Sequence, residues 1–172
     1  MADDPPGFRA FVDARSSALL RTAWMLTGDG QLAEDLLQAA LARTWPHWRR
    51  VRDGQPEAYV RRVMVNLQAA WWRRRWRGEQ PSDDVPDGLV GGDPFAAVDE
   101  RLLLTAALRA LPLRQRQVVV LRYYEDLSEH EVAAVMGCSA GTVKSQAAKG
   151  LAKLRVALAP TDARPVATPE AL

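Results

Sequence analysis

The sequence predicts an all-α protein built from two small helical domains. Apolar residues recur every three or four positions along most of the chain, and no alternating run is long enough to demand a sheet. One acidic segment punctuated by Gly and Pro interrupts this pattern. With 172 residues, of which 48% are hydrophobic, the chain can bury real cores. We expect a first domain over 1–77, a flexible linker over 78–95, a second domain over 96–158 and a disordered tail over 159–172.

Three helices are expected in the first domain. The first spans about 8–26, where apolar residues form one stripe, and the Gly- and Asp-containing segment 27–30 ends it. The second spans about 31–45 and should stop or kink at Pro46, whose ring is incompatible with a regular helix interior. The third spans about 57–77. It has one apolar side and one strongly basic side, which makes it a candidate binding element.

Four helices are expected in the second domain. Proline disfavours helix in the residue before it, so Leu111–Pro112 separates the first two. Ser128 and Glu131 have the spacing of a capping box, and Ser139 can cap the last helix in the same way. The run 118–120 favours a strand locally, but its helical flanks make an isolated strand a poor alternative. The predicted helices span about 96–110, 113–124, 128–137 and 139–158.

The strongest functional pattern is a helix-turn-helix over Leu127–Leu154. In such a unit the first helix braces the second, whose early residues enter the major groove of DNA. Gln146 can bond adenine in a bidentate manner, while Lys144 and Lys149 suit phosphate or guanine. An ordinary helical hairpin with a solvated face is the alternative. The candidate DNA-binding residues are Ser139, Thr142, Lys144, Ser145, Gln146 and Lys149.

Basic and aromatic residues gather on the third predicted helix. Several nearby cations repel one another and usually indicate an anionic partner, although a solvated basic face is the alternative. Trp72 and Trp76 are candidates for stacking on bases, whereas Trp71, and as an alternative also Trp72, are candidate core residues. The arginines expected to contact phosphates are Arg61, Arg62, Arg73, Arg74 and Arg75.

The composition argues against an enzyme, a metalloprotein and a membrane protein. One cysteine and two histidines, His47 and His130, offer neither a disulfide nor a zinc site, and we expect no cofactor, metal or catalytic residue. Gly28–Asp29–Gly30 is a turn and not a phosphate loop. No signal peptide or membrane-spanning run is recognisable, so a cytoplasmic protein is expected. The net charge of +2 says little, because the charges are segregated along the chain.

The second domain resembles region 4 of bacterial sigma factors. The resemblance is carried by Leu111–Gln117, Leu127–Ala133 and Gly141–Ser145. It implies that this domain reads the −35 promoter element. Taken alone, these segments are also similar to the DNA-binding domain of LuxR-type regulators. The sequence of the first domain is therefore needed to distinguish the two families.

The first domain resembles sigma region 2, which favours a two-domain sigma factor of the extracytoplasmic-function type. Ala33–Gln38 with Ala42–Trp45 is similar to the polymerase-docking helix, and Ala58–Leu67 is similar to the segment that reads the −10 element. By this resemblance Asn66 lies beside a flipped −10 base, and melting is helped by Trp72 and the arginines. The resemblance implies that the polymerase-binding residues are Asp35, Leu36, Gln38, Leu41 and Trp45.

The resemblance also implies the partners. They are promoter DNA and the RNA polymerase core, through the clamp helices and the flap, with an anti-sigma factor as a candidate inhibitor. Val65 and Ala70 depart from the family, which often has an arginine before the asparagine and an aspartate four residues after it. The promoter sequence is therefore not predicted. The acidic linker either threads toward the polymerase active centre or is a solubilising spacer, and Cys138 either fills a small gap or is a redox switch.

Overall fold

A computed structural model describes residues 4–78 and 97–160, with side chains over 4–75 and 100–160. Every regular element in these ranges is helical, as the sequence predicted. The predicted linker beyond Gly78 and the predicted tail beyond Pro160 lie outside the described residues.

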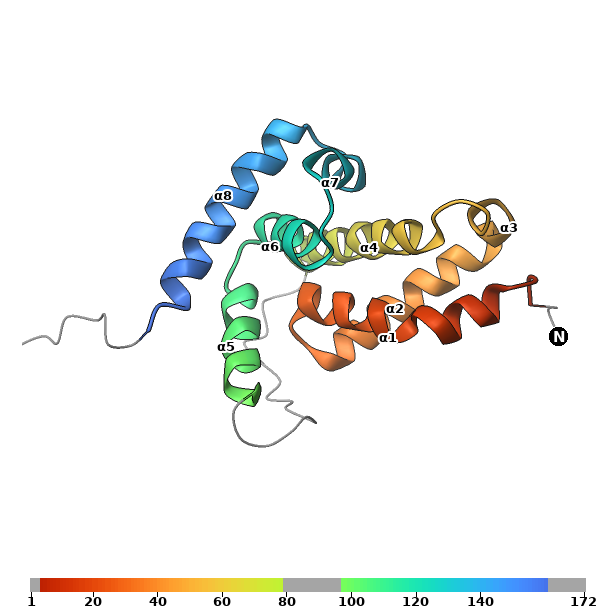
Figure 1. The fold of residues 1–172 in the computed structure, drawn as a ribbon, viewed down its shortest axis with the longest axis horizontal. Helices are drawn as coiled ribbons and strands as arrows, with labels where there is room; N and C mark the ends of the chain where they lie inside the picture. Colours follow the sequence, from red (N-terminus) through yellow and green to blue (C-terminus); the bar gives the residue numbers. More distant parts are fainter. Residues whose placement is uncertain (1–3, 79–96, 161–172) are drawn as a thin grey trace, which may run out of the picture.

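The N-terminal half, residues 4–78, is built around three long helices that pack on one another (Figure 1). Gly28 ends the first of them in a left-handed conformation with φ 69°, and Asp29 caps the next by accepting from the Leu32 amide at 2.8 Å. Their shared core includes Leu19, Leu36 and Met64. The elements are α1 (Phe8–Thr27), α2 (Gly30–Thr44), η1 (Trp45–His47), α3 (Trp48–Val51) and α4 (Pro56–Gly78).

Helix α2 ends at Thr44, just before Pro46, as the sequence predicted. Pro46 lies in the 3₁₀ turn η1, and the chain continues directly into the short helix α3. Proline is tolerated there because the first turn of a helix leaves its backbone amides unpaired. Trp48 at the start of α3 is buried against Phe8 and Phe11, with ring centroids 5.2 and 5.0 Å away. The indole therefore anchors α3 to the beginning of α1.

The C-terminal half, residues 97–160, contains the four predicted helical segments. The capping box of Ser128 and Glu131 is confirmed, Gly137 ends α7 with φ 66°, and Ser139 caps α8. Val118–Val120 is helical and buried, so the strand alternative does not occur. The elements are α5 (Ala97–Arg109), α6 (Leu113–Val119), the π-helical turn η2 (Val120–Tyr124), α7 (Glu129–Met136) and α8 (Ala140–Ala157).

A glycine sets the packing of α8 against α6. A Cβ added at Gly150 would lie 2.7 Å from Val119 Cγ2 and 3.5 Å from the Gln115 carbonyl oxygen. Only a residue without a side chain allows this approach of the two helices. The N-terminal end of α8 packs against α7, the first helix of the predicted helix-turn-helix (Figure 1).

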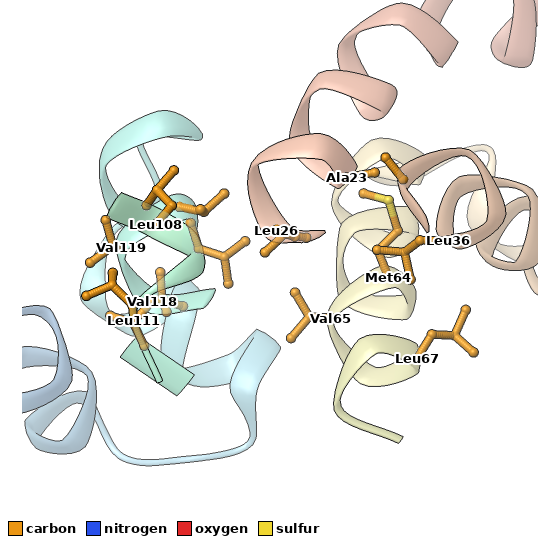
Figure 2. Close-up of a cluster of buried hydrophobic side chains, with 14 of the residues drawn as sticks. Ala23, Leu26, Leu36, Met64, Val65, Leu67, Leu108, Leu111, Val118 and Val119 are labelled. Atoms are coloured by element: carbon orange, nitrogen blue, oxygen red, sulfur yellow. The ribbon is translucent and has the colours of Figure 1, made fainter. Parts of the chain in front are cut away.

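The two halves share one continuous core. α5 and η2 contact α1, while α7 contacts α4. Figure 2 shows Leu26 and Val65 between the buried side chains of the C-terminal half, such as Val118, and those of the N-terminal half, such as Met64. The close approach extends to Gly28, where an added Cβ would lie 2.2 Å from Arg109 Cγ. In this structure the halves are thus packed directly against each other.

Candidate nucleic-acid interface

Helix α8, the predicted recognition helix, has one buried and one exposed side. Val143, Ala147, Gly150 and Leu154 are buried, which turns the opposite side of the helix to solvent. Among the six predicted DNA-binding residues, Lys144, Ser145 and Lys149 are exposed, whereas Thr142 and Gln146 are half-buried.

Ser139 and Thr142 have a local structural task at the start of α8. The Thr142 amide donates to Ser139 Oγ at 3.1 Å, and the two hydroxyl oxygens are 2.9 Å apart. This cap fixes where the helix begins and therefore which side chains its first turns present. Of the predicted DNA-binding residues on the exposed side of α8, Lys144 and Lys149 carry the charge.

Helix α4 has three sides with different surroundings. Val60, Met64 and Leu67 recur at i, i+4 and i+7 and are buried in the core of the N-terminal half. A second row, Arg61, Val65, Gln68 and Trp72, follows the same helical spacing, and its first three members contact residues of the C-terminal half. A third row remains exposed and consists of Arg62, Asn66 and Arg73.

The exposed row of α4 contains the groups expected beside DNA. Asn66 lies between Arg62 and Arg73 on this side of the helix, so an amide with donor and acceptor groups is flanked by two cations. Arg74 and Arg75 at the end of the described side chains are also exposed. Trp72 is 41% exposed, whereas Trp71 is half-buried and packs against the core, as predicted for a core residue.

Arg61 differs from the other predicted phosphate contacts. Its Nη2 lies 2.7 Å from Glu57 Oε1, and its Nε lies 2.7 Å from Glu125 Oε2. The side chain is only 18% exposed. In this arrangement Arg61 is neutralised within the protein.

The predicted polymerase-docking residues lie on α2 and the turn after it. Asp35 and Gln38 are exposed, and Asp35 accepts from Gln31 Nε2 at 3.2 Å. Leu41 and Trp45 are half-buried and line a shallow, mainly apolar hollow of about 400 Å³, which Phe8, Val12 and Ala42 complete. An apolar hollow beside exposed polar groups is typical of the centre and rim of a protein interface.

Leu36 requires a correction, because its side chain is not on this surface. It is 0% exposed and packs in the core of the N-terminal half. Leu36 lies on the apolar stripe of α2 with Ala33, Leu37 and Ala40, and this stripe faces inward. Leu36 therefore holds α2 in the core and offers no side chain to this surface.

A set of buried polar residues lies between the halves and was not predicted from the sequence. Gln68, Gln117 and Arg116 are 7%, 1% and 7% exposed and donate to backbone or amide oxygens of neighbouring helices. Burial, followed by repulsion from Arg109, lowers the pKa of Arg116. A signal was present in the sequence, since a glutamine beside the apolar run 118–121 must find a partner if it is buried.

The remaining candidate features are few. Cys138 is a free, half-buried thiol that packs against the core, which fits its gap-filling role. Over the residues that the structure describes, no group of three or more His, Cys, Asp or Glu could hold a metal ion. None of the helices in those ranges is long and apolar enough to cross a membrane.

Both halves of the chain match known protein families. Residues 11–78 match Sigma-70 region 2, and residues 101–154 match Sigma-70 region 4. The chain is 44% identical over 156 residues to the RNA polymerase sigma-E factor of Streptomyces coelicolor, covering 90% of this chain and 88% of the relative. It is 31% identical to the ECF RNA polymerase sigma factor SigL of Mycobacterium tuberculosis, with 87% and 88% covered.

A solved structure agrees with this result. The fold is similar to that of the sigma factor RpoE from Bartonella quintana, crystallised in complex with the anti-sigma factor NepR. The TM-score is 0.74 at 25% identity, with 88% of this chain and 96% of that chain covered.

Proposed function

The chain belongs to the sigma-70 family, as an extracytoplasmic-function RNA polymerase sigma factor, and from this premise we propose how its surfaces divide the work of transcription initiation. Region 2 in the N-terminal half sets aside the alternative of a LuxR-type regulator. The observation that supports the proposal most is the exposed row of α4, where Asn66 lies between arginines on an otherwise packed helix.

We assign reading of the −10 element to that row. Pulling a base from the stack costs a few kcal/mol, which hydrogen bonds to the base and aromatic stacking offset. Asn66 can supply the hydrogen bonds, and Arg62, Arg73, Arg74 and Arg75 can hold the neighbouring phosphates. The exposed part of Trp72 is available to stack on a base.

Reading of the −35 element falls to α8. The exposed Lys144 and Ser145 lie near the start of the helix that a helix-turn-helix places in the major groove, and the exposed Lys149 lies about one turn later. Gln146 is half-buried at the edge of this surface, so it would reach a base from one side.

Docking to the polymerase falls to the hollow beside α2. Leu41 and Trp45 provide apolar area for the centre of the contact, and Asp35 and Gln38 provide a polar rim suited to a basic partner helix. The protein would act with the polymerase in the cytoplasm. An anti-sigma factor is a candidate inhibitor, as NepR is bound to the similar RpoE.

Run-off transcription from genomic fragments with purified core polymerase tests the proposal. Products that require both the core and this chain are expected. Tight, sequence-specific binding to duplex DNA by the chain alone would contradict it.

The residue assignment is tested by Asn66→Ala with Gln146→Ala as a matched control on the other reading helix. We expect Asn66→Ala to impair open-complex formation, measured by permanganate reactivity, without weakening attachment to the core. Gln146→Ala should instead weaken initial promoter binding. Equal loss of opening and of core attachment in Asn66→Ala would make Asn66 a structural residue.

A further inference from the structure

Buried polar groups join the two halves in one defined arrangement. Gln117 Nε2 donates to the Val65 carbonyl at 3.3 Å and to Gln68 Oε1 at 3.1 Å. Arg116 Nη1 and Gln68 Nε2 both donate to the Leu26 carbonyl, at 3.0 and 2.6 Å. Polar groups that satisfy one another in a buried site specify a single packing. The contact between the halves is therefore specific in register.

At the edge of this contact an acidic residue of the C-terminal half meets two residues of the N-terminal half. Glu125, directly after η2, has its Oε2 at 2.7 Å from Arg61 Nε, and its Oε1 accepts from the hydroxyl of Thr22. The Glu125 side chain is 8% exposed. A carboxylate here takes the place that a phosphate oxygen would take beside Arg61.

The closed arrangement is too compact to read both promoter elements together. α7 contacts both α4 and α8, and helices in contact have axes about 8–10 Å apart, so the reading helices are separated by roughly 20 Å. The −35 and −10 elements are about 25 base pairs apart, which is about 85 Å along the duplex. The halves must separate before both helices can engage one promoter.

We propose that Glu125 is an internal latch, which holds the halves closed by occupying Arg61 in place of a DNA phosphate until polymerase or DNA opens the molecule. The inference rests on the proposed function, since it takes α4 and α8 to be the two reading helices. Opening removes one of the two carboxylates that pair with Arg61 and leaves Glu57 on the same helix as its partner. The separation that gives the correct spacing therefore also makes the −10 surface of α4 more positive.

Glu125→Gln tests the latch, because it removes the charge and keeps the shape. Asp126→Asn is the matched control, since it removes a charge from the next, exposed residue, whose φ of 54° suits asparagine. Spin labels at Ser17→Cys and Ala152→Cys, both exposed sites, in a Cys138→Ser background report the distance between α1 and α8. We expect one short distance for the parent and for Asp126→Asn, and an added longer population for Glu125→Gln.

Binding to a short single-stranded DNA of mixed sequence gives the second measurement. Glu125→Gln should bind it at least about fivefold more tightly than Asp126→Asn does, because the substitution removes one of the two carboxylates that pair with Arg61. Arg61→Gln should also open the halves but without tighter DNA binding.

Unchanged distances in Glu125→Gln, or tighter binding without a change in distance, would overturn the latch. Adding core polymerase to the spin-labelled parent shows whether such a result contradicts only the latch or also the proposed function. A shift to a long distance on adding core supports the sigma-factor assignment whatever Glu125 does. No shift together with no transcription would overturn that assignment itself.

Discussion

Arg61 and Arg62 are neighbours in the sequence but lie in different surroundings. Arg61 faces the C-terminal half and is paired with Glu57 and Glu125, whereas Arg62 is exposed beside Asn66. Successive residues of a helix are about 100° apart, so one step in sequence moves a side chain from an interface to an open surface. The number of arginines on α4 therefore overstates the cations that the closed molecule offers to DNA.

The same contrast between buried and exposed arginines recurs on α6, and it gives the largest expected effect. Arg116 donates to the carbonyls of Leu26, Arg109 and Leu111, whereas Arg114 is exposed. Arg116→Met should lower the free energy of unfolding by about 3 kcal/mol, because three backbone acceptors lose a charged donor and two of these hydrogen bonds are buried. Removing a buried cation also removes the free-energy cost of its desolvation, but this gain offsets only part of the loss. Urea unfolding followed by circular dichroism measures it.

Arg114→Met is the control for Arg116. A substitution at this exposed site should change the unfolding free energy by less than about 0.5 kcal/mol. Equal effects of the two substitutions would mean that the contacts of Arg116 add nothing to the stability of the closed state.

Two glycines of α8 allow its packed side to be compared with its exposed side. Gly150→Ala should destabilise by about 2 kcal/mol, because the new Cβ would lie 2.7 Å from Val119 Cγ2. Gly141 lies on the exposed side, where an added Cβ would be 3.8 Å from Ser139 Oγ, so Gly141→Ala should be neutral or stabilising by up to about 1 kcal/mol. Thermal unfolding of both variants checks this. A harmless Gly150→Ala would mean that α6 and α8 can move apart easily.

Features that depend on a few adjacent residues were predictable from the sequence. The capping box at Ser128, the cap at Ser139 and the end of α1 at Gly28 each use contacts within four residues, so their patterns are visible in the chain. The helix-turn-helix and the exposed positions Lys144 and Lys149 follow from the same local rules. Helical spacing also separates Asn66 from the core side of α4.

Features that depend on distant partners were not predictable in this way. Glu125 meets Arg61 and Thr22 across 64 and 103 positions, and no local pattern indicates such a pair. Val65 was noted only as a departure from the family, yet it is 2% exposed in the contact between the halves. Leu36 was placed on the docking surface because its neighbours were, although its own helical position turns it inward.

DNA binding by the isolated chain should distinguish the two arginines of α4. Arg62→Gln should reduce the slope of log K against log salt by about 1, because one phosphate contact is lost. Arg61→Gln should leave the slope unchanged in the isolated chain, since Arg61 is already paired. In the complex with core polymerase the proposed opening takes Glu125 away from Arg61, so both substitutions should reduce the slope there. Equal reductions in the isolated chain would show that Arg61 is as available as Arg62.

The smallest expected effect concerns Glu131, whose carboxylate is exposed yet held by local contacts. It accepts from the Ser128 amide at 2.7 Å, and this bond, with that of the Ser128 hydroxyl, lowers the pKa of Glu131. A lowered pKa in the folded state contributes stability above the usual glutamate pKa, and this contribution is lost as the pH falls through the folded value. The melting temperature of Glu131→Gln should therefore lie below that of the parent near neutral pH and approach it in acid. Glu131→Ala removes the acceptor altogether and should melt lower than the parent at both pH values. If the difference in melting temperature between Glu131→Gln and the parent did not change with pH, the charge on Glu131 would play no part in the cap.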